Sequence, residues 1–176
     1  YPEADLDLPS FFDFATLCTS QVPVGRGGLE DQHHLDINLD FKKPHLQHVY
    51  DMLANYRSTM IWTNGKWKIV TDRADTPTRQ AFHSGNMIPK RTQVRLGVDP
   101  SKPNQCNVDF MNARLGYTRD TVPVVDNQSV IVNNDPIKDF DLSLLGITRE
   151  SEAIREANYH LRRRRDPRRE VTWATG

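Results

Sequence analysis

Two adjacent histidines, His33 and His34, are the residues whose type points most directly to metal chemistry, because imidazole binds zinc and other transition metals. Asp31 and Asp36 flank the pair and add carboxylates of the kind that complete such sites. The residues around them predict a strand, however, and neighbouring strand residues point to opposite faces of a sheet. The two histidines therefore cannot easily bind one ion together, and we expect a solvated junction between a loop and a strand.

A second histidine pair, His45 and His48, lies three positions apart on a predicted helix and therefore shares one helix face. With one further carboxylate this pair could bind zinc, but the sequence has no HExxH motif and no third ligand nearby. Cys18 and Cys106 lie far apart and form no CxxC motif, so ordinary buried thiols are expected. The sequence predicts no metal site and no cofactor.

Five aspartates provide the carboxylates that paired acid–base hydrolysis of glycosides would need. They are Asp72, Asp75, Asp135, Asp139 and Asp141. Each falls in a predicted loop or strand edge, where acids normally face solvent, and no cleft signature accompanies them. The chain has no GxSxG motif for a serine nucleophile, and its glycines at positions 25, 27 and 28 match neither GxGxxG nor a Walker pattern. We therefore expect no enzymatic activity.

A basic run near the end of the chain is its most unusual electrostatic feature. The six arginines are Arg162, Arg163, Arg164, Arg165, Arg168 and Arg169, which with Asp166 give the run a net charge of +5. Cations at a helix C-terminus complement the helix dipole, and Pro167 would end such a helix. We expect these arginines to contact protein. The alternative is contact with a nucleic-acid backbone, although no aromatic residues are interleaved to stack on bases.

The overall composition favours neither alternative. The chain has 176 residues, of which 37% are hydrophobic and 26% charged, and its 23 basic residues balance its 23 acidic residues. Global charge therefore predicts neither nucleic acid nor a membrane as partner, and no apolar run approaches the ~20 residues of a membrane span. Because the sequence starts with Tyr1 rather than Met, we expect a fragment or a processed product.

Apolar periodicity predicts an α+β fold in which about three helices pack on antiparallel β hairpins and small sheets. Helices are expected at Leu8–Gln21, from Pro44 to Leu53, and from Thr148, as N-cap, to the arginine run. The glycines of Pro23–Gln32 predict a mobile loop. Strands are predicted at Leu35–Phe41, Gln93–Leu96, Asn107–Met111, Tyr117–Val125 and Ile137–Leu142. Pro123 places Tyr117–Val125 at a sheet edge.

The strongest local signal is the dipeptide Asn64-Gly65 between two runs of alternating apolar residues. Both residues tolerate a positive φ, so the dipeptide favours a two-residue type I′ hairpin. In that register Trp62 lies opposite Trp67, and both indoles lie on one face of the hairpin.

A closing strand carries Val171, Trp173 and Thr175 on one face and has no partner strand after it in the sequence, so we expect its sheet to be completed elsewhere. We expect three units along the chain. They are an N-terminal helix and glycine-rich loop (1–32), an α+β subdomain with a helix and a hairpin (33–115), and strands, a long helix and a terminal strand leading into the next domain (116–176).

Several motifs, taken in order, resemble the hub segment of the tip-attachment (host-specificity) family of long-tailed phages. Each motif is weak alone, but their order and spacing together are fairly specific. The matching stretches are Leu8–Cys18, Val49–Ala54, Met60–Val70, Phe82–Ile88, Pro103–Phe110, Leu144–Leu161 and Arg169–Trp173. The loop Val24–His34 departs from the family pattern.

The resemblance implies a hub-type tail domain in a homotrimeric baseplate hub that closes the tail tube at the tip of the virion, after synthesis in the bacterial cytoplasm. Its implied partners are the distal tail protein and the tape-measure protein, with DNA passing nearby and a receptor-binding part further along the same polypeptide. Two other readings stay open. One is a nucleic-acid-binding module that uses Arg162–Arg169, and the other is a fragment of a tail-associated cell-wall hydrolase.

Overall fold

The computed structural model describes residues 3–25, 27–39, 42–73, 83, 88, 93–96, 102–165 and 169–174. In these residues the α-helices are α1 (Leu8–Cys18), α2 (His45–Ala54) and α3 (Glu150–Arg165). Three antiparallel strand pairs are β1 (Gln21–Pro23) with β2 (Leu29–Asp31), β3 (Ser58–Thr63) with β4 (Lys66–Thr71), and β5 (Gln93–Leu96) with β9 (Arg169–Thr172). A further sheet has the order β7 (Thr118–Val125), β6 (Gln105–Asn112), β8 (Asp139–Ser143). The predicted α+β class is confirmed.

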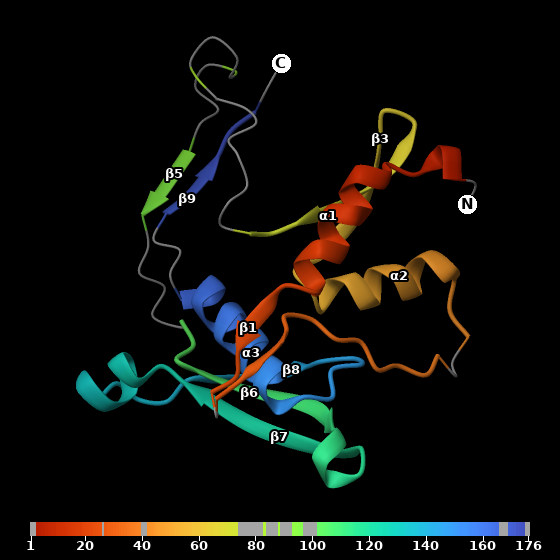
Figure 1. Cartoon of the computed structure of the whole chain (residues 1–176). Coiled ribbons are helices and arrows are strands. Elements are labelled where there is room, and N and C mark those ends of the chain that lie inside the picture. Colours follow the sequence, from red (N-terminus) through yellow and green to blue (C-terminus); the bar gives the residue numbers. More distant parts are fainter. Residues whose placement is uncertain are drawn as a thin grey trace.

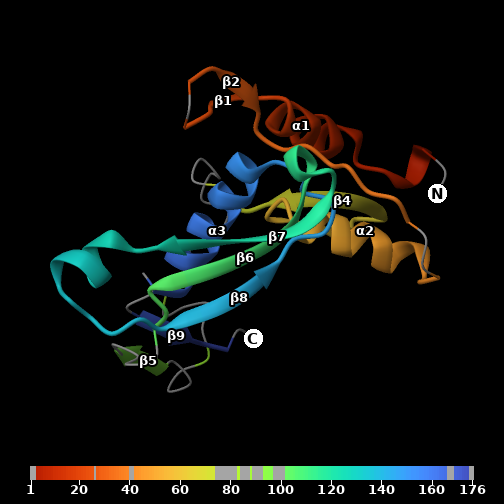
Figure 2. The ribbon, with the colours of Figure 1, turned by 90° about the horizontal axis from the view of Figure 1, so that it is seen from below.

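The three-stranded sheet and α3 enclose the larger apolar core. In the central strand β6, every second side chain is buried, including Cys106, Val108 and Phe110. These side chains pack against Ala153, Ala157 and Leu161 of α3, which lies across one face of the sheet (Figures 1 and 2). Strand β7 runs antiparallel to β6 and forms one edge, as Pro123 predicts, whereas β8 runs parallel to β6 at the other edge.

A second, smaller core lies between α1, α2 and the β3–β4 hairpin. Leu53, Met60 and Ile69 are its buried residues. The hairpin is also held to α1 by a hydrogen bond, because the backbone amide of Ile69 donates to the Ser10 hydroxyl at 3.1 Å. The part of the chain from α1 to β4 therefore builds an apolar centre of its own.

The Asn64-Gly65 hairpin is confirmed. Asn64 and Gly65 have φ angles of 52° and 73°, as a type I′ turn requires. Trp62 lies opposite Trp67 in the ladder, and the two rings meet edge to face with centroids 5.1 Å apart.

Two predictions for residues 23–41 are wrong. Pro23–Gln32 is not loop throughout, because Gln21–Pro23 and Leu29–Asp31 pair as β1 and β2 around a turn in which Gly27 and Gly28 have positive φ. The predicted strand Leu35–Phe41 does not form over its described residues, up to position 39. Its backbone instead meets the turn at Gly146, whose carbonyl accepts a hydrogen bond from the Asp36 amide at 2.8 Å.

Two predictions near the C-terminus also need correction. Thr148 is not the N-cap, because α3 begins at Glu150 and the Thr148 hydroxyl donates to the Asp36 carboxylate at 2.6 Å. The closing strand β9 has its partner earlier in the chain, since Val171 pairs with Val94 of β5. Trp173 follows β9 and is 38% exposed.

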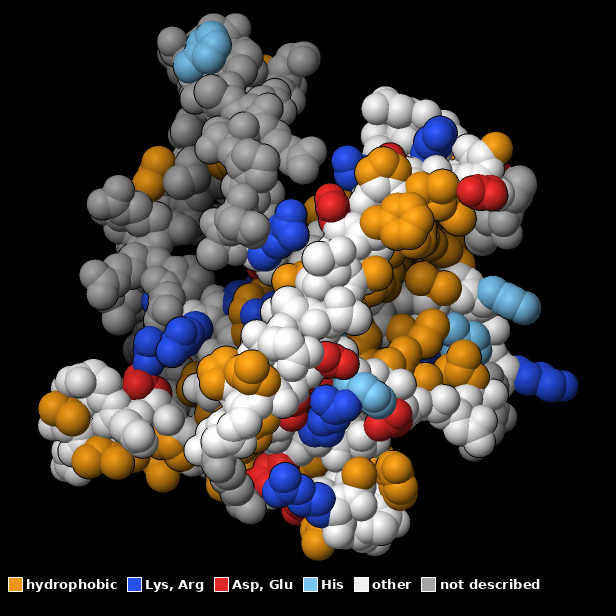
Figure 3. Space-filling model, in the orientation of Figure 1, with side chains coloured by type: hydrophobic (Ala, Val, Ile, Leu, Met, Phe, Trp, Pro, Cys, Tyr) orange, Lys and Arg blue, Asp and Glu red, His pale blue; other side chains and the backbone are white. Residues whose placement is uncertain are grey.

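The connection between β7 and β8 projects from the sheet and carries exposed apolar side chains (Figure 3). It contains a π-helical turn, Gln128–Val132, in which Ile131 and Val132 are 71% and 67% exposed, and Ile137 follows at 59%. The connection is held in place because the Asn104 side chain hydrogen-bonds Ser129 and the Pro136 carbonyl. Among the described residues, no helix has both the length and the apolar composition needed to cross a membrane.

Candidate anion-binding site

Helix α3 presents two chemically different faces because its residues recur at three- and four-residue spacing. One face carries Ala153, Ala157 and Leu161, which are buried against the sheet. The other face carries polar and charged side chains, namely Arg155, Asn158, Tyr159, Arg162 and Arg163. Acidic residues lie in the first turn and arginines in the last, which suits the helix dipole.

Between the two faces, Glu152 and Glu156 are fully buried. Burying a carboxylate is costly unless it is paired and hydrogen-bonded. Arg57 provides that partner for Glu156, donating through Nε at 3.0 Å and Nη2 at 2.8 Å. Glu152 accepts a hydrogen bond from the His34 backbone amide at 3.0 Å, and His33 Nδ1 lies 3.5 Å from the same carboxylate. This polar junction joins the two apolar cores.

The expectation of a solvated His33 is wrong. Its side chain is buried, with the ring centroid 5.0 Å from that of Tyr56. The reason is the packing of α3, which brings Glu152 and Glu156 under this segment. The neighbouring His34 is partly exposed and lies 3.3 Å from the Asp36 carboxylate.

Arg57 also contacts Tyr159, so one guanidinium serves two residues of α3. Its Cζ lies 4.1 Å from the centroid of the Tyr159 ring, within the range of a cation–π contact. The Tyr159 hydroxyl donates to Asp72, just after β4. Burial and this hydrogen bond raise the pKa of Tyr159. The β3–β4 hairpin is thereby tied to α3 at both of its ends.

Arg155 is engaged with the β1–β2 segment. It forms an ion pair with Glu30, and its Nη2 donates to the Gln32 carbonyl at 2.8 Å. Burial of Glu30 opposes ionisation, but hydrogen bonds from Arg155 and Ser151 and the charge of Arg155 outweigh it and lower the pKa of Glu30. Arg155 and Glu30 therefore remain an ion pair at neutral pH.

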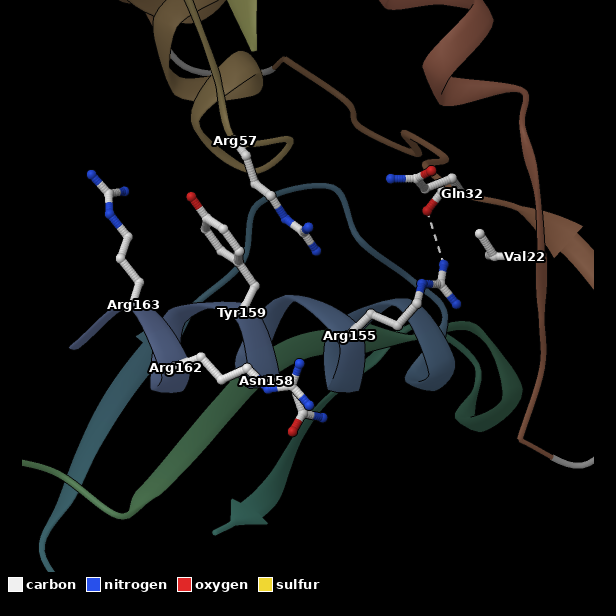
Figure 4. A pocket seen from close by; sticks show the side chains of 8 residues that line it. All are labelled: Val22, Gln32, Arg57, Arg155, Asn158, Tyr159, Arg162 and Arg163. Atoms are coloured by element: carbon white, nitrogen blue, oxygen red, sulfur yellow. Dashed lines mark hydrogen bonds between the residues drawn. The ribbon is translucent and has the colours of Figure 1, made fainter. Parts of the chain in front are cut away.

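These contacts surround an open pocket of about 930 Å³ on the polar face of α3. Its lining residues are Val22, Gln32, Arg57, Arg155, Asn158, Tyr159, Arg162 and Arg163 (Figure 4). Figure 4 shows Tyr159 and Arg163 rising from the same side of the helix, with Arg57 reaching toward Tyr159 from the α2–β3 connection. Among the described residues, the lining has four guanidinium groups and no carboxylate, which suits it to binding an anion.

The predicted arginine run separates into groups with different surroundings. Arg162 and Arg163 are exposed at the pocket. Arg164 instead stacks on the Phe140 ring with its Cζ 3.8 Å from the centroid, and Arg165 pairs with Asp126. These two arginines fix the helix end to the sheet. Arg168 and the side chain of Arg169 lie outside the described residues.

The other predicted candidates do not gather into one site. Asp139 and Asp141 lie on the outer face of β8 and share the Asn107 amide, Asp135 accepts from Ser129, and Asp75 lies outside the described residues. His45 is exposed at the start of α2 and His48 lies one turn later. Within the described part of the chain, no three His, Cys, Asp or Glu side chains group closely enough to hold a metal ion.

Cys18 and Cys106 are free thiols. Cys106 is completely buried in the larger core, and Cys18 is partly buried at the end of α1. Burial raises the pKa of both thiols to about 11, so both are protonated at neutral pH.

Sequence reasoning missed the residues that build the polar junction, Arg57, Glu152 and Glu156, and the pocket residue Tyr159. One signal was available, because Glu152 and Glu156 lie four positions apart and directly precede the buried Ala153 and Ala157. Acids at the border of a packed helix face need a partner of opposite charge if they are buried.

Comparison with known proteins finds a distant similarity to a phage tail-tip protein. No protein-family model matches it. The chain is 22% identical over 156 residues to the tip attachment protein J of Escherichia phage SECphi4, an alignment that covers 89% of this chain. The same alignment covers 14% of the phage protein, so the chain spans about one seventh of that relative's length.

Proposed function

We propose that this chain is a non-enzymatic structural segment of a phage or prophage-derived tail tip, within the central baseplate hub protein. The observation that carries the proposal is the similarity to a tip attachment protein along 89% of the chain. In this role the segment helps to assemble the distal end of the tail and links it to host recognition.

Two surfaces of the chain support a role in assembly. One is the arginine pocket, where Arg162 and Arg163 are exposed on a helix that is packed on its other face. The second is the β7–β8 connection, whose exposed Ile131 and Val132 are held by a hydrogen-bonded turn. Exposed apolar patches and arginines are both common features of protein interfaces. The proposed partners are two further copies of the hub, the distal tail protein and the tape-measure protein.

Charge reversal tests the proposed assembly role. The double change Arg162→Glu/Arg163→Glu is introduced into the full-length protein of the phage or prophage that encodes it. We expect a loss of complete tails, because the reversed charges repel an acidic partner surface. The control is Lys42→Glu/Lys66→Glu, which changes the charge equally at exposed residues that do not line the pocket. Normal tails and normal infectivity from the Arg162/Arg163 variant would contradict the assembly role.

Nucleic-acid contact is the second candidate function, and the exposure of Arg162 and Arg163 is the observation that favours it. A phosphate-driven interaction weakens steeply as salt concentration rises. Tight DNA binding with that salt dependence, together with tails that assemble but fail to deliver DNA, would favour this candidate over the first.

The absence of enzymatic activity is part of the proposal and has its own test. Purified chain should not lyse peptidoglycan in a zymogram, and protein prepared without metal-affinity steps should contain no stoichiometric zinc. Lysis that a single carboxylate substitution abolishes would identify a cell-wall hydrolase instead.

A further inference from the structure

Among the described residues, four arginines line the pocket, of which two are neutralised by acids of the chain and two are not. Arg57 pairs with Glu156, and Arg155 pairs with Glu30. Arg162 and Arg163 are exposed and form no ion pair with any residue of the described chain. We propose that the pocket binds the carboxylate side chains of an acidic protein segment, and that Arg162 and Arg163 are the residues that bind them.

The two binding arginines are mounted on a rigid support. The helix beneath them is packed through Leu161, and the next two arginines fasten its end, Arg164 on Phe140 and Arg165 on Asp126. The carbonyl of Arg165 also accepts a hydrogen bond from Lys102 at 2.7 Å. A guanidinium on a fixed element loses less conformational freedom on binding, so more of its interaction energy appears as affinity.

The buried acids determine how deep an acidic ligand can reach. Glu156 and Glu30 lie behind Arg57 and Arg155, Glu152 is buried nearby, and Asp72 accepts the Tyr159 hydroxyl. These carboxylates repel a second carboxylate from the inner end of the pocket. Ligand acids are therefore confined to its outer part, where the free cations lie.

The uncharged lining favours a protein segment over a nucleic acid. Val22 and the Tyr159 ring give the pocket an apolar wall, which suits an aliphatic side chain next to the acids. One face of the Tyr159 ring is covered by Arg57, and the His160 ring meets Tyr159 edge to face at 5.3 Å, so this ring is poorly placed to stack on a base. Recognition of a nucleic-acid backbone also favours a longer basic track than Arg162 and Arg163, the two unpaired arginines among the described residues of the pocket.

This inference deepens the proposed function, because it names the chemistry of the partner at the tail tip, and its test does not require tail assembly. The probe is a short fluorescent peptide of alternating Glu and Leu, titrated with the purified 176-residue chain while anisotropy is followed. The control probe is the same peptide with Gln in place of Glu. We expect the Glu peptide to bind and the Gln peptide not to bind.

Three variants separate a binding role from a structural one. Arg162→Glu/Arg163→Glu should weaken peptide binding by about a hundredfold, since two charged hydrogen-bonded contacts are lost. Arg162→Lys/Arg163→Lys should weaken it by roughly tenfold, because the charge stays and the planar fork is lost. Lys42→Glu/Lys66→Glu should bind as the parent does. All three should keep the thermal unfolding midpoint of the parent, because the altered side chains are exposed.

Three results would overturn the inference. One is that the Glu peptide does not bind, and a second is equal binding by the Arg162→Glu/Arg163→Glu variant. A third is that a labelled DNA oligonucleotide binds more tightly than the peptide at the same salt concentration, which would assign the arginines to nucleic acid. None of these results would contradict the proposed tail-tip role. That role is tested separately, by locating the protein in the virion.

Discussion

The core under the sheet and the polar junction on the other side of α3 are both buried, but they are stabilised by different forces. The core contains Val108, Phe110 and Ile147, and its stability depends on apolar area removed from water. The junction contains Glu152 and Glu156. Arg57 pairs with Glu156, whereas Glu152 accepts one hydrogen bond, from the His34 amide, and lies near the His33 ring. Apolar packing stabilises each of the two cores. The junction sets how the two cores contact each other and positions the side chains of Arg57 and Tyr159.

This difference has a consequence for the pocket. A buried ion pair contributes little net stability compared with a well-packed apolar pair, but breaking it leaves an unpaired charge behind. We expect the junction to favour one arrangement of α3 against the β3–β4 hairpin, because other arrangements would leave these charges unpaired. Arg57 and Tyr159 also line the pocket, so the contacts of the junction determine the positions of these two pocket residues.

The largest expected effect is in the apolar core. Phe110→Ala should lower the free energy of unfolding by about 3–5 kcal/mol, because a buried ring is lost and a cavity remains. Urea denaturation followed by circular dichroism measures the change. Met111→Ala is the matched control, since Met111 is the next residue on the outer face of β6 and is 44% exposed. Equal losses for the two variants would mean that the buried face is assigned wrongly.

The polar junction should respond less strongly to the loss of one partner. Glu156→Gln should lower the free energy of unfolding by about 2 kcal/mol, because the charged hydrogen bonds to Arg57 are lost. The double variant Arg57→Met/Glu156→Leu should lower the free energy of unfolding by less than the sum of the losses from Arg57→Met and Glu156→Leu, since it leaves no buried charge unpaired. Additive costs in this double-mutant cycle would show that the two residues do not act as a pair.

The pH dependence of the free energy of unfolding also distinguishes the polar junction from the apolar core, and the expected change is smaller than those above. Burial lowers the pKa of His160 below its ordinary value of 6.5; the charges of Arg163, Arg164 and Arg57 lower it further, and Glu156 partly opposes them. The unfolded chain therefore takes up a proton first, and stability is lost as the pH falls below about 6.5. His160→Gln should remove this part of the pH dependence in urea unfolding, whereas Phe110→Ala should leave it unchanged. An unaltered pH profile in the His160 variant would refute the assignment.

The smallest effect is expected in the β3–β4 hairpin, outside both regions. Trp62→Thr should lower the free energy of unfolding by about 1 kcal/mol, because Trp62 is 53% exposed and its edge-to-face contact with Trp67 is local. Thermal unfolding monitored by circular dichroism is sensitive enough to detect this change. A loss as large as that of Phe110→Ala would show that the hairpin ring is part of a core.

The same contrast explains how much the sequence alone predicts. The hairpin was predictable because Asn64, Gly65 and both tryptophans lie within one short segment, and the turn chemistry is local. The ion pair between Arg57 and Glu156 was not predictable. The two residues are 99 positions apart, and the sequence around either one gives no indication of its partner. The alternating pattern of Leu35–Phe41 predicted a strand, but a strand also needs a neighbour to bond with, and periodicity does not supply one. The arginine run was visible at once, whereas its division between helix anchoring and pocket lining required the packing of α3.

The most direct test of the tail-tip proposal is the location of the protein in the particle. Virions or induced prophage particles from the strain that encodes the chain are labelled with gold-conjugated antibodies raised against the purified chain and viewed by electron microscopy. The account predicts gold at the distal end of the tail and nowhere else on the particle. Gold on heads or along the tail shaft, or particles that lack the protein altogether, would contradict it.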